Sequence, residues 1–147
     1  MERSVENESK ERYMKAAYAE AEKAFAEDEV PVGCVIVKAG KIIARAHNRK
    51  EKKNSAIFHA EIECINKATR KLNNWNLKGC ELYVTLEPCM MCTSAIVQSH
   101  IKKVIYCLKS PKYGYLLKVA KSNKIECIQM YNQEYEKLLK NFFADKR

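Results

Sequence analysis

Two short segments about 30 residues apart carry side chains that commonly bind metal ions. His59 is followed two positions later by Glu61, and Cys89 and Cys92 form a C-x-x-C pair directly after Pro88. A catalytic zinc ion takes three protein ligands and keeps one position open, whereas a structural zinc ion takes four. If His59 and the two cysteines bind one ion, the fold must bring both segments together.

The local sequence around the cysteine pair favours the start of a helix. Proline is common at the first helical position, where its missing N–H group has no cost. A helix that begins at Pro88 would place Cys89 and Cys92 on one face, because they are three residues apart. The positive end of the helix dipole would lower the pKa of both thiols. Thiolates bind metal, so this placement suits a metal site.

The spacing of His59 and Glu61 predicts a helix start at the other segment as well. Two residues apart on a regular helix, their side chains would point about 200° away from each other. They face one metal ion only where the backbone is still irregular, and a helical pattern begins at about Phe58. Zinc lowers the pKa of its bound water to about 7. A carboxylate beside that water can take its proton and deliver it to a substrate.

The cysteine pair could also be a redox pair or half of a structural zinc site. A redox pair is disfavoured by the two Met residues between the cysteines, which replace a Trp-Gly-Pro-type turn. A structural zinc site needs a fourth ligand, and none of the other five cysteines is paired at metal spacing. Apolar runs around three of them predict core positions for Cys34, Cys107 and Cys127. The joint pattern therefore favours a catalytic zinc site.

Length and composition indicate one domain over residues 1–147, with no repeat or linker. No apolar run is long enough to cross a membrane. Residues 1–10 are polar and do not resemble a signal or transit peptide. The seven cysteines are an odd number, and two are assigned to metal. This usage fits a reducing, cytoplasmic setting better than a disulfide framework.

Positive charge is concentrated in the last third of the chain. Residues 98–147 contain 11 Lys/Arg and 4 Asp/Glu, a net charge of +7, whereas the first 97 residues carry +2 of the total +9. Such a basic segment is typical of a nucleic-acid contact surface. A lysine-rich surface that is only solvated is the alternative, and charge alone does not separate the two.

The hydrophobic pattern predicts an α/β fold. Strands that alternate with helices imply a mixed five-stranded sheet covered on both faces, a three-layer α/β/α arrangement. Both metal segments then begin helices at one edge of the sheet, where ligand sites in such folds lie. Helices are expected over residues 7–26, 58–72, 88–100 and 132–144, with a short one ending near 120, and strands over 32–38, 41–47, 81–86, 103–108 and 124–130. In the last helix, apolar residues at helical spacing predict a buried face: Tyr135, Leu138, Leu139, Phe142 and Phe143.

With these motifs, the chain resembles the cytidine-deaminase-like fold and, within it, the bacterial tRNA-specific adenosine deaminases. The V-P-V-G, N-W-x-L and T-L-E-P-C-x-M-C segments carry the resemblance more specifically than the zinc pattern alone, which is itself a known signature of zinc deaminases. The matching segments are spread over nearly the whole chain, at residues 29–33, 43–48, 59–61, 74–77, 82–92 and 138–143.

The resemblance implies a homodimer that converts adenosine at the first anticodon position of a tRNA to inosine. It implies one zinc ion per subunit, held by His59, Cys89 and Cys92, with Glu61 as the proton shuttle. It also implies that Asn48 hydrogen-bonds the adenine ring; a turn residue explains Asn48 equally well. The base would be framed by the backbone N–H of Ala60 and by the surroundings of Val30 and Leu86.

For the tRNA, the resemblance implies contacts by Phe142, Phe143 and the basic tail that follows them. A core position is the plainer interpretation of both phenylalanines, because their helical spacing already explains them. The loop after the fourth strand keeps the family's Lys112, but Ser110 replaces the usual Asp. Tyr-Leu-Leu at residues 115–117 replaces a Gly/Ser-rich stretch, and the following loop is shorter. These departures concern the RNA contact and leave the zinc motif intact.

Two further functions remain compatible with the sequence. One keeps the zinc chemistry but acts on a free base or nucleotide, such as guanine or deoxycytidylate; the altered loop after the fourth strand favours it, and the basic last third argues against it. The other is a non-catalytic RNA-binding partner subunit. The presence of Glu61 argues against the latter, because a subunit without catalysis has no chemical need for that carboxylate.

Overall fold

The computed structural model describes residues 5–145 and contains the expected mixed five-stranded sheet, in the order β2-β1-β3-β4-β5. Strand β1 is antiparallel to β2 and β3, and β3, β4 and β5 are parallel. The elements are α1 (Val5–Ala26), β1 (Gly33–Lys38), β2 (Lys41–His47), α2 (Ala60–Leu72), β3 (Glu81–Leu86), α3 (Met90–Gln98), β4 (Lys103–Leu108), α4 (Leu116–Val119), β5 (Glu126–Gln129) and α5 (Gln133–Ala144).

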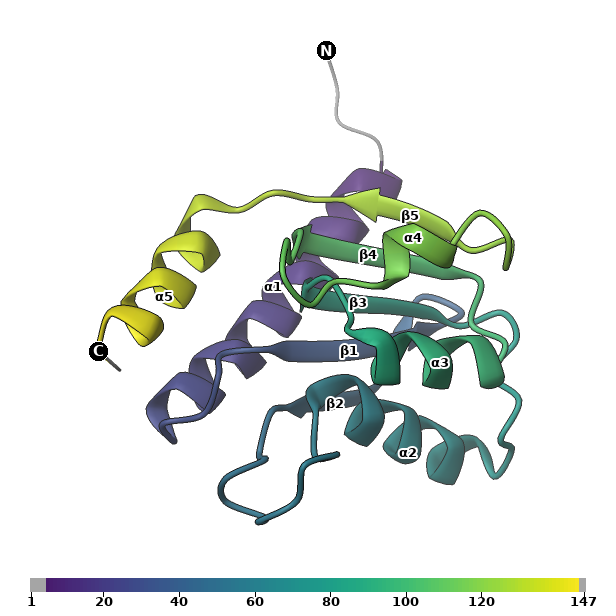
Figure 1. The fold of residues 1–147 in the computed structure, drawn as a ribbon. Helices are drawn as coiled ribbons and strands as arrows, with labels where there is room; N and C mark the ends of the chain where they lie inside the picture. The colour runs from purple at the N-terminus through teal and green to yellow at the C-terminus, as the bar shows by residue number, and fades with distance from the viewer. Residues whose placement is uncertain (1–4, 146–147) are drawn as a thin grey trace.

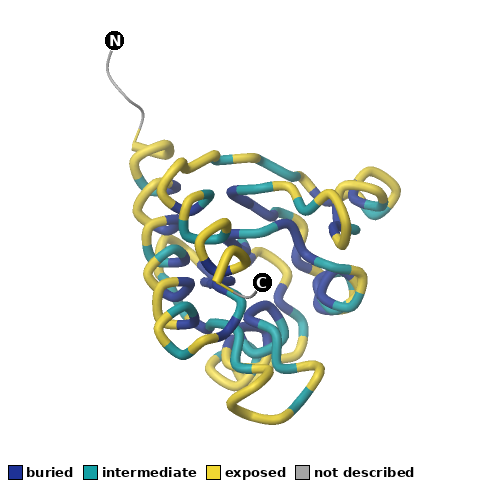
Figure 2. Tube along the Cα trace, turned by 60° about the vertical axis from the view of Figure 1, so that its left-hand side comes forward, coloured by how far each residue is buried: buried dark blue, intermediate teal, exposed yellow. Residues whose placement is uncertain are grey.

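Helices cover both faces of this sheet, so the predicted three-layer arrangement is confirmed (Figure 1). Strand β1 shows why: its side chains alternate between two apolar clusters. Cys34 and Ile36 pack with residues of α2 and α3, whereas Val35 and Val37 pack with residues of α1. Figure 2 shows the buried residues gathered along the strands and on the inward sides of the helices.

Strand direction places one end of the sheet beside the starts of α2 and α3. Because β1 alone runs in the opposite direction, the C-terminal ends of β2, β3 and β4 share one edge. Helix α5 lies at the same edge (Figure 1), where the Tyr135 hydroxyl donates to the Pro31 carbonyl at 2.7 Å. No helix among residues 5–145 is both long and apolar enough to cross a membrane.

Helix α3 starts later than the sequence suggested. Cys89 is its N-cap, with φ −73° and ψ 178°, and the first helical residue is Met90, so the prediction that Pro88 begins the helix is wrong. The Pro88 carbonyl instead accepts the backbone N–H of Tyr115 at 3.0 Å. That hydrogen bond connects Pro88 to the loop after β4, so the Pro88 carbonyl is not part of the hydrogen-bond pattern of helix α3.

Two expectations about burial are also wrong. Tyr135 and Phe142 of α5 are buried, but Phe143 is 52% exposed. Helix α5 packs on α1 and the sheet edge only along a narrow stripe, in which Phe142 contacts Phe25 at a ring distance of 6.4 Å. Cys127 is only half-buried, because β5 is an edge strand.

Helix α1 approaches β1 so closely that only glycine fits at Gly33. An ideal Cβ atom there would lie 1.9 Å from the Ala17 carbonyl oxygen and 2.5 Å from the Ala21 nitrogen, both backbone atoms. Since backbone atoms cannot rotate away, any side chain at this position must push the helix from the sheet.

We expect Gly33→Ala to lower the free energy of unfolding by about 3 kcal/mol or more, because it overpacks a backbone contact. Gly40→Ala is the matched control: Gly40 has φ 76° and no atom within 4 Å of an added Cβ. That substitution should cost only the roughly 1–2 kcal/mol of a left-handed alanine. Chemical denaturation of both variants measures the difference, and equal losses would contradict the close approach.

A partly buried ion cluster joins the C-terminal end of α1 to the edge strand β2. His47 bridges two carboxylates, with Nδ1 3.1 Å from Glu20 and Nε2 2.8 Å from Glu27, and Lys23 Nζ lies 2.7 Å from Glu20. Burial opposes the charge of Glu20, but the hydrogen bonds from His47 and Lys23 prevail and lower its pKa from 4.5 to about 2. The hydrogen bond to Glu20 is the main reason that the pKa of His47 is raised.

These shifts predict a window of pH in which the cluster stabilises the fold. The contribution of Glu20 is complete above pH 4.5 and is lost as the pH falls toward about 2. The contribution of His47 is complete below pH 6.5 and is lost as the pH rises through its raised pKa. Between pH 4.5 and 6.5, Glu20→Gln should therefore lower the free energy of unfolding by about 3 kcal/mol. Denaturant titrations at several pH values test this, and a loss that does not depend on pH would contradict it.

Candidate active site

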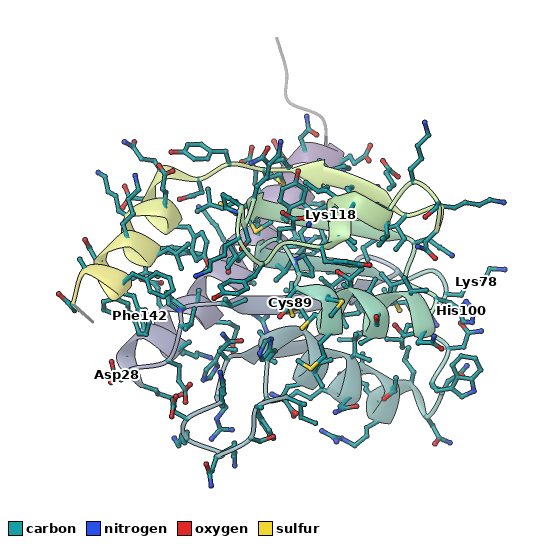
Figure 3. All side chains as sticks on the ribbon, viewed as in Figure 1. Asp28, Lys78, Cys89, His100, Lys118 and Phe142 are labelled. Atoms are coloured by element: carbon teal, nitrogen blue, oxygen red, sulfur yellow. The ribbon has the colours of Figure 1, made fainter. Side chains whose placement is uncertain are left out.

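The three predicted metal ligands meet at the sheet edge. The Nδ1 atom of His59 lies 3.8 Å from the sulfur of Cys89 and 3.6 Å from that of Cys92, and all three donor atoms lie within 4.8 Å of one another. His59 is the N-cap of α2 and Cys89 the N-cap of α3. Figure 3 labels Cys89 at the start of α3. The prediction that both metal segments begin helices at one edge is confirmed.

The electrostatic surroundings favour a thiolate at this group. Hydrogen bonds from Cys92 and His59 lower the pKa of Cys89 to about 4, although burial opposes the shift. The hydrogen bond that the Cys92 thiol donates to Cys89, together with burial, raises the pKa of Cys92. The hydrogen bond to Cys89 raises the pKa of His59. A cation at the centre of the group would favour deprotonation of all three donors.

The donor set fits zinc in a catalytic site. One imidazole and two thiolates are ligands that zinc prefers, and the group formed by the described residues has three members, which leaves a fourth position for water or substrate. Cys34 and Cys64 are buried nearby but are not part of it: the Cys64 thiol donates to the Cys34 carbonyl at 3.5 Å. The structural-zinc alternative therefore finds no fourth ligand in residues 5–145.

Glu61 lies in the first turn of α2, two residues after His59, and is only 4% exposed. The extended backbone of His59, with φ −84° and ψ 153°, makes this approach possible. Burial raises the pKa of the Glu61 carboxyl to about 7, and a bound cation would lower it. The carboxyl group is thus within reach of the metal group and secluded from solvent.

Asn48 is oriented by the residue between His59 and Glu61. Its side-chain oxygen accepts the backbone N–H of Ala60 at 2.8 Å, and its own backbone N–H donates to Val32. The Ala60 N–H is therefore committed to Asn48 and is not free to bind a base. This hydrogen bond orients the Asn48 amide and leaves its nitrogen as a donor. Val30 and Leu86 are half-buried and pack against the core on the α2 side.

Comparisons with known proteins agree with this geometry. The family model of MafB19-like deaminases matches residues 8–147. A tRNA-specific adenosine deaminase of Aquifex aeolicus is 50% identical over 110 residues, which are 75% of this chain and 73% of the relative. The chain belongs to the tRNA-specific adenosine deaminase family.

Solved structures of deaminases share the fold of this chain. One from work on A-to-I editing by tRNA:A34 deaminases at the wobble position of transfer RNA is 36% identical, with a TM-score of 0.76 over 81% of this chain and 97% of that chain. A guanine deaminase of Bacillus subtilis is 30% identical, with a TM-score of 0.67 over 92% of both chains. Deaminases that are named for different substrates thus share this fold.

The deaminase holds the loop after β4 with a buried carboxylate that the sequence analysis missed. Glu87 is 8% exposed and accepts the backbone N–H groups of Ser110 and Leu117, both at 3.1 Å. Gly114 packs against it so closely that an added Cβ would lie 2.2 Å from its Oε1 atom. An acidic residue before a proline gives no local signal of this role, because its partners lie 23 and 30 residues away.

The residues expected to contact RNA occupy different environments. Lys112 is exposed, with Nζ 5.3 Å from the centre of the Tyr113 ring. Ser110 is bound through its backbone to Glu87. Phe142 is buried against α1 (Figure 3), whereas Phe143 is accessible. The end of the basic tail, residues 146–147, lies outside the described residues.

Removal of one ligand should abolish tight zinc binding. In Cys89→Ala, zinc affinity should fall by more than about 100-fold, because loss of a direct ligand exceeds the 10–100-fold effect of outer partners. Cys127→Ala is the matched control, since Cys127 lies outside the metal group. Elemental analysis and competition with a chelating dye measure the stoichiometry and affinity, and equal zinc loss in both variants would refute the assignment.

Proposed function

We propose that the chain deaminates adenosine at the first anticodon position of tRNA to inosine, with one zinc ion held by His59, Cys89 and Cys92. The observation that carries the proposal is the arrangement of Glu61 and Asn48 on either side of Ala60, next to a three-donor group. This arrangement supports a role for the carboxylate in proton transfer and for the amide in binding the base. Membership of a family of tRNA-specific adenosine deaminases supports the choice of substrate.

The reaction adds water to C6 of adenine and releases ammonia. A zinc ion bound by three protein ligands supplies Lewis acidity that lowers the pKa of a coordinated water to about 7. Glu61 accepts a proton from the attacking water and delivers it to the ring nitrogen N1. The same carboxylate then moves the proton of the new C6 hydroxyl to the amine; the C6–N bond breaks, ammonia leaves, and the C6 carbonyl of inosine remains.

Asn48 positions the base in this scheme. Because its oxygen is occupied by the Ala60 N–H, its amide group faces the substrate as a donor, which suits the acceptor nitrogens of a purine. The half-buried side chains of Val30 and Leu86 would border the ring. The adenosine must leave its stack, and this costs less in an open anticodon loop than in a duplex.

The wider surface supports an RNA substrate and a second subunit. The net charge of +9 favours a polyanion, and the exposed Lys112 and Phe143 suit a loop whose bases are splayed apart. Exposed Ile57 and Met90 adjoin the two metal segments and would be covered in a homodimer. A tRNA-modifying homodimer of this kind would act in the cytoplasm.

Inosine formation in an anticodon stem-loop tests the proposal. The parent should convert adenosine at the first anticodon position, and Glu61→Gln should lower kcat by at least about 100-fold while retaining zinc, because only the proton transfer is removed. Asn48→Ala should mainly raise KM, because its amide group binds the base. Nucleoside analysis of the product gives the rates, and elemental analysis gives the zinc content.

Other outcomes identify the alternatives. Conversion of guanine or deoxycytidylate, with none of the stem-loop, would establish a small-molecule deaminase. A chain that binds zinc and the stem-loop but shows no turnover would be a partner subunit.

A further inference from the structure

A polar groove of about 300 Å³ runs along the open edge of β2, between α1 and α2. Four basic side chains line it, those of Lys23, Arg45, Arg49 and Lys67, against the carboxylates of Glu20 and Glu63. Glu20 is already neutralised, because it binds both His47 and Lys23. The remaining charge in the groove is positive, which favours an anion.

Arg49 is the residue of this groove whose hydrogen bonding is incomplete. Its Nε atom is the only buried side-chain nitrogen or oxygen in residues 5–145 that has no hydrogen-bond partner. A buried donor without an acceptor is destabilising and rare in native proteins. A guanidinium group offers a fork of N–H donors that matches the oxygens of a phosphate. A phosphate bound by Arg49 would therefore supply the acceptor that its Nε–H group lacks.

The backbone of Arg49 is fixed relative to the metal group. Its N–H donates to the carbonyl of Phe58 at 3.1 Å, and Phe58 directly precedes His59. On its other side, Arg49 follows Asn48, the residue bound to Ala60.

A second contact holds the loop that follows Arg49. The buried carboxylate of Glu29 accepts the backbone N–H groups of Glu51 and Lys52, at 3.0 and 2.8 Å. Hydrogen bonds thus hold the backbone on both sides of Arg49, next to the metal group.

We propose that this groove binds a phosphodiester group of the RNA strand that presents the target adenosine, with Arg49 as its anchor. The inference rests on the proposed function and adds a backbone contact next to the base site. A base held at Asn48 carries its own sugar and phosphates, so the strand must continue across a surface that adjoins this residue. The groove begins one residue away and has the matching charge. Inorganic phosphate shares this chemistry, so the test must separate it from RNA.

The test compares Arg49→Gln with Arg70→Gln in the zinc-loaded full chain. Both variants lose one positive charge, but Arg70 is an exposed residue in the last turn of α2, outside the groove. In Arg49→Gln, the dissociation constant of an anticodon stem-loop should rise about 10-fold, and the slope of its logarithm against log salt should fall by about 1. KM for inosine formation should rise in parallel while kcat is preserved. Arg70→Gln should match the parent in all of these.

Additional variants keep the test decisive if Arg49→Gln is unstable in thermal unfolding. Arg49→Lys retains the charge but loses the fork, and Lys67→Gln removes a second groove cation. Each should weaken stem-loop binding less than Arg49→Gln, and more than Arg70→Gln.

Several outcomes would overturn the proposal. Equal weakening in the Arg49 and Arg70 variants would mean that only bulk charge matters, and unchanged binding in every groove variant would exclude the contact. Inhibition by inorganic phosphate that disappears in Arg49→Gln, with stem-loop binding intact, would assign the groove to a free anion. A parent that neither binds nor deaminates the stem-loop would instead refute the proposed function, whatever the groove variants do.

Discussion

The site depends on two helix starts that meet at one edge of the sheet. His59 and Cys89 both have extended backbones at the N-caps of α2 and α3, with ψ angles of 153° and 178°. In that conformation a side chain projects from the end of the helix and not along its flank. The C-terminal ends of β2 and β3, which precede the two helix starts, lie at the same edge of the sheet, because both strands run antiparallel to β1. A change in the direction of either strand would separate the donors.

Two buried carboxylates hold the loops around this site. Glu29 binds two backbone N–H groups in the loop before α2, and Glu87 binds two in the loop after β4. Hydrogen bonds to a charged acceptor are stronger than those between neutral groups. Short loops with few apolar side chains can therefore be kept in one shape without a core of their own, and their basic and aromatic residues remain at the surface for a partner.

The loop after β4 lies beside a three-donor group that fits a metal ion. The donors His59, Cys89 and Cys92 meet, and Asn48 binds Ala60 next to them, whereas Tyr115 and its two neighbours stand where the family resemblance implies a Gly/Ser-rich stretch. The loop is nevertheless anchored to the site, since the Tyr115 N–H donates to the Pro88 carbonyl and Glu87 holds both of its ends. Substrate selection can therefore diverge in this loop while the chemistry next to it is unchanged.

The sequence by itself determined the fold class, the order of the elements and the metal group. Hydrophobic periodicity is a local property, and the helices and strands that it predicted are present. His59, Cys89 and Cys92 come from two segments about 30 residues apart, and the motif predicted that they would meet, as they do. The start of α3, the exposure of Phe143 and the commitment of the Ala60 N–H were decided by tertiary structure. Each depends on a partner distant in sequence, such as Tyr115 for Pro88 or Asn48 for Ala60. The roles of Glu29 and Glu87 were hidden for the same reason: a carboxylate that accepts backbone N–H groups leaves no pattern in the residues that donate them.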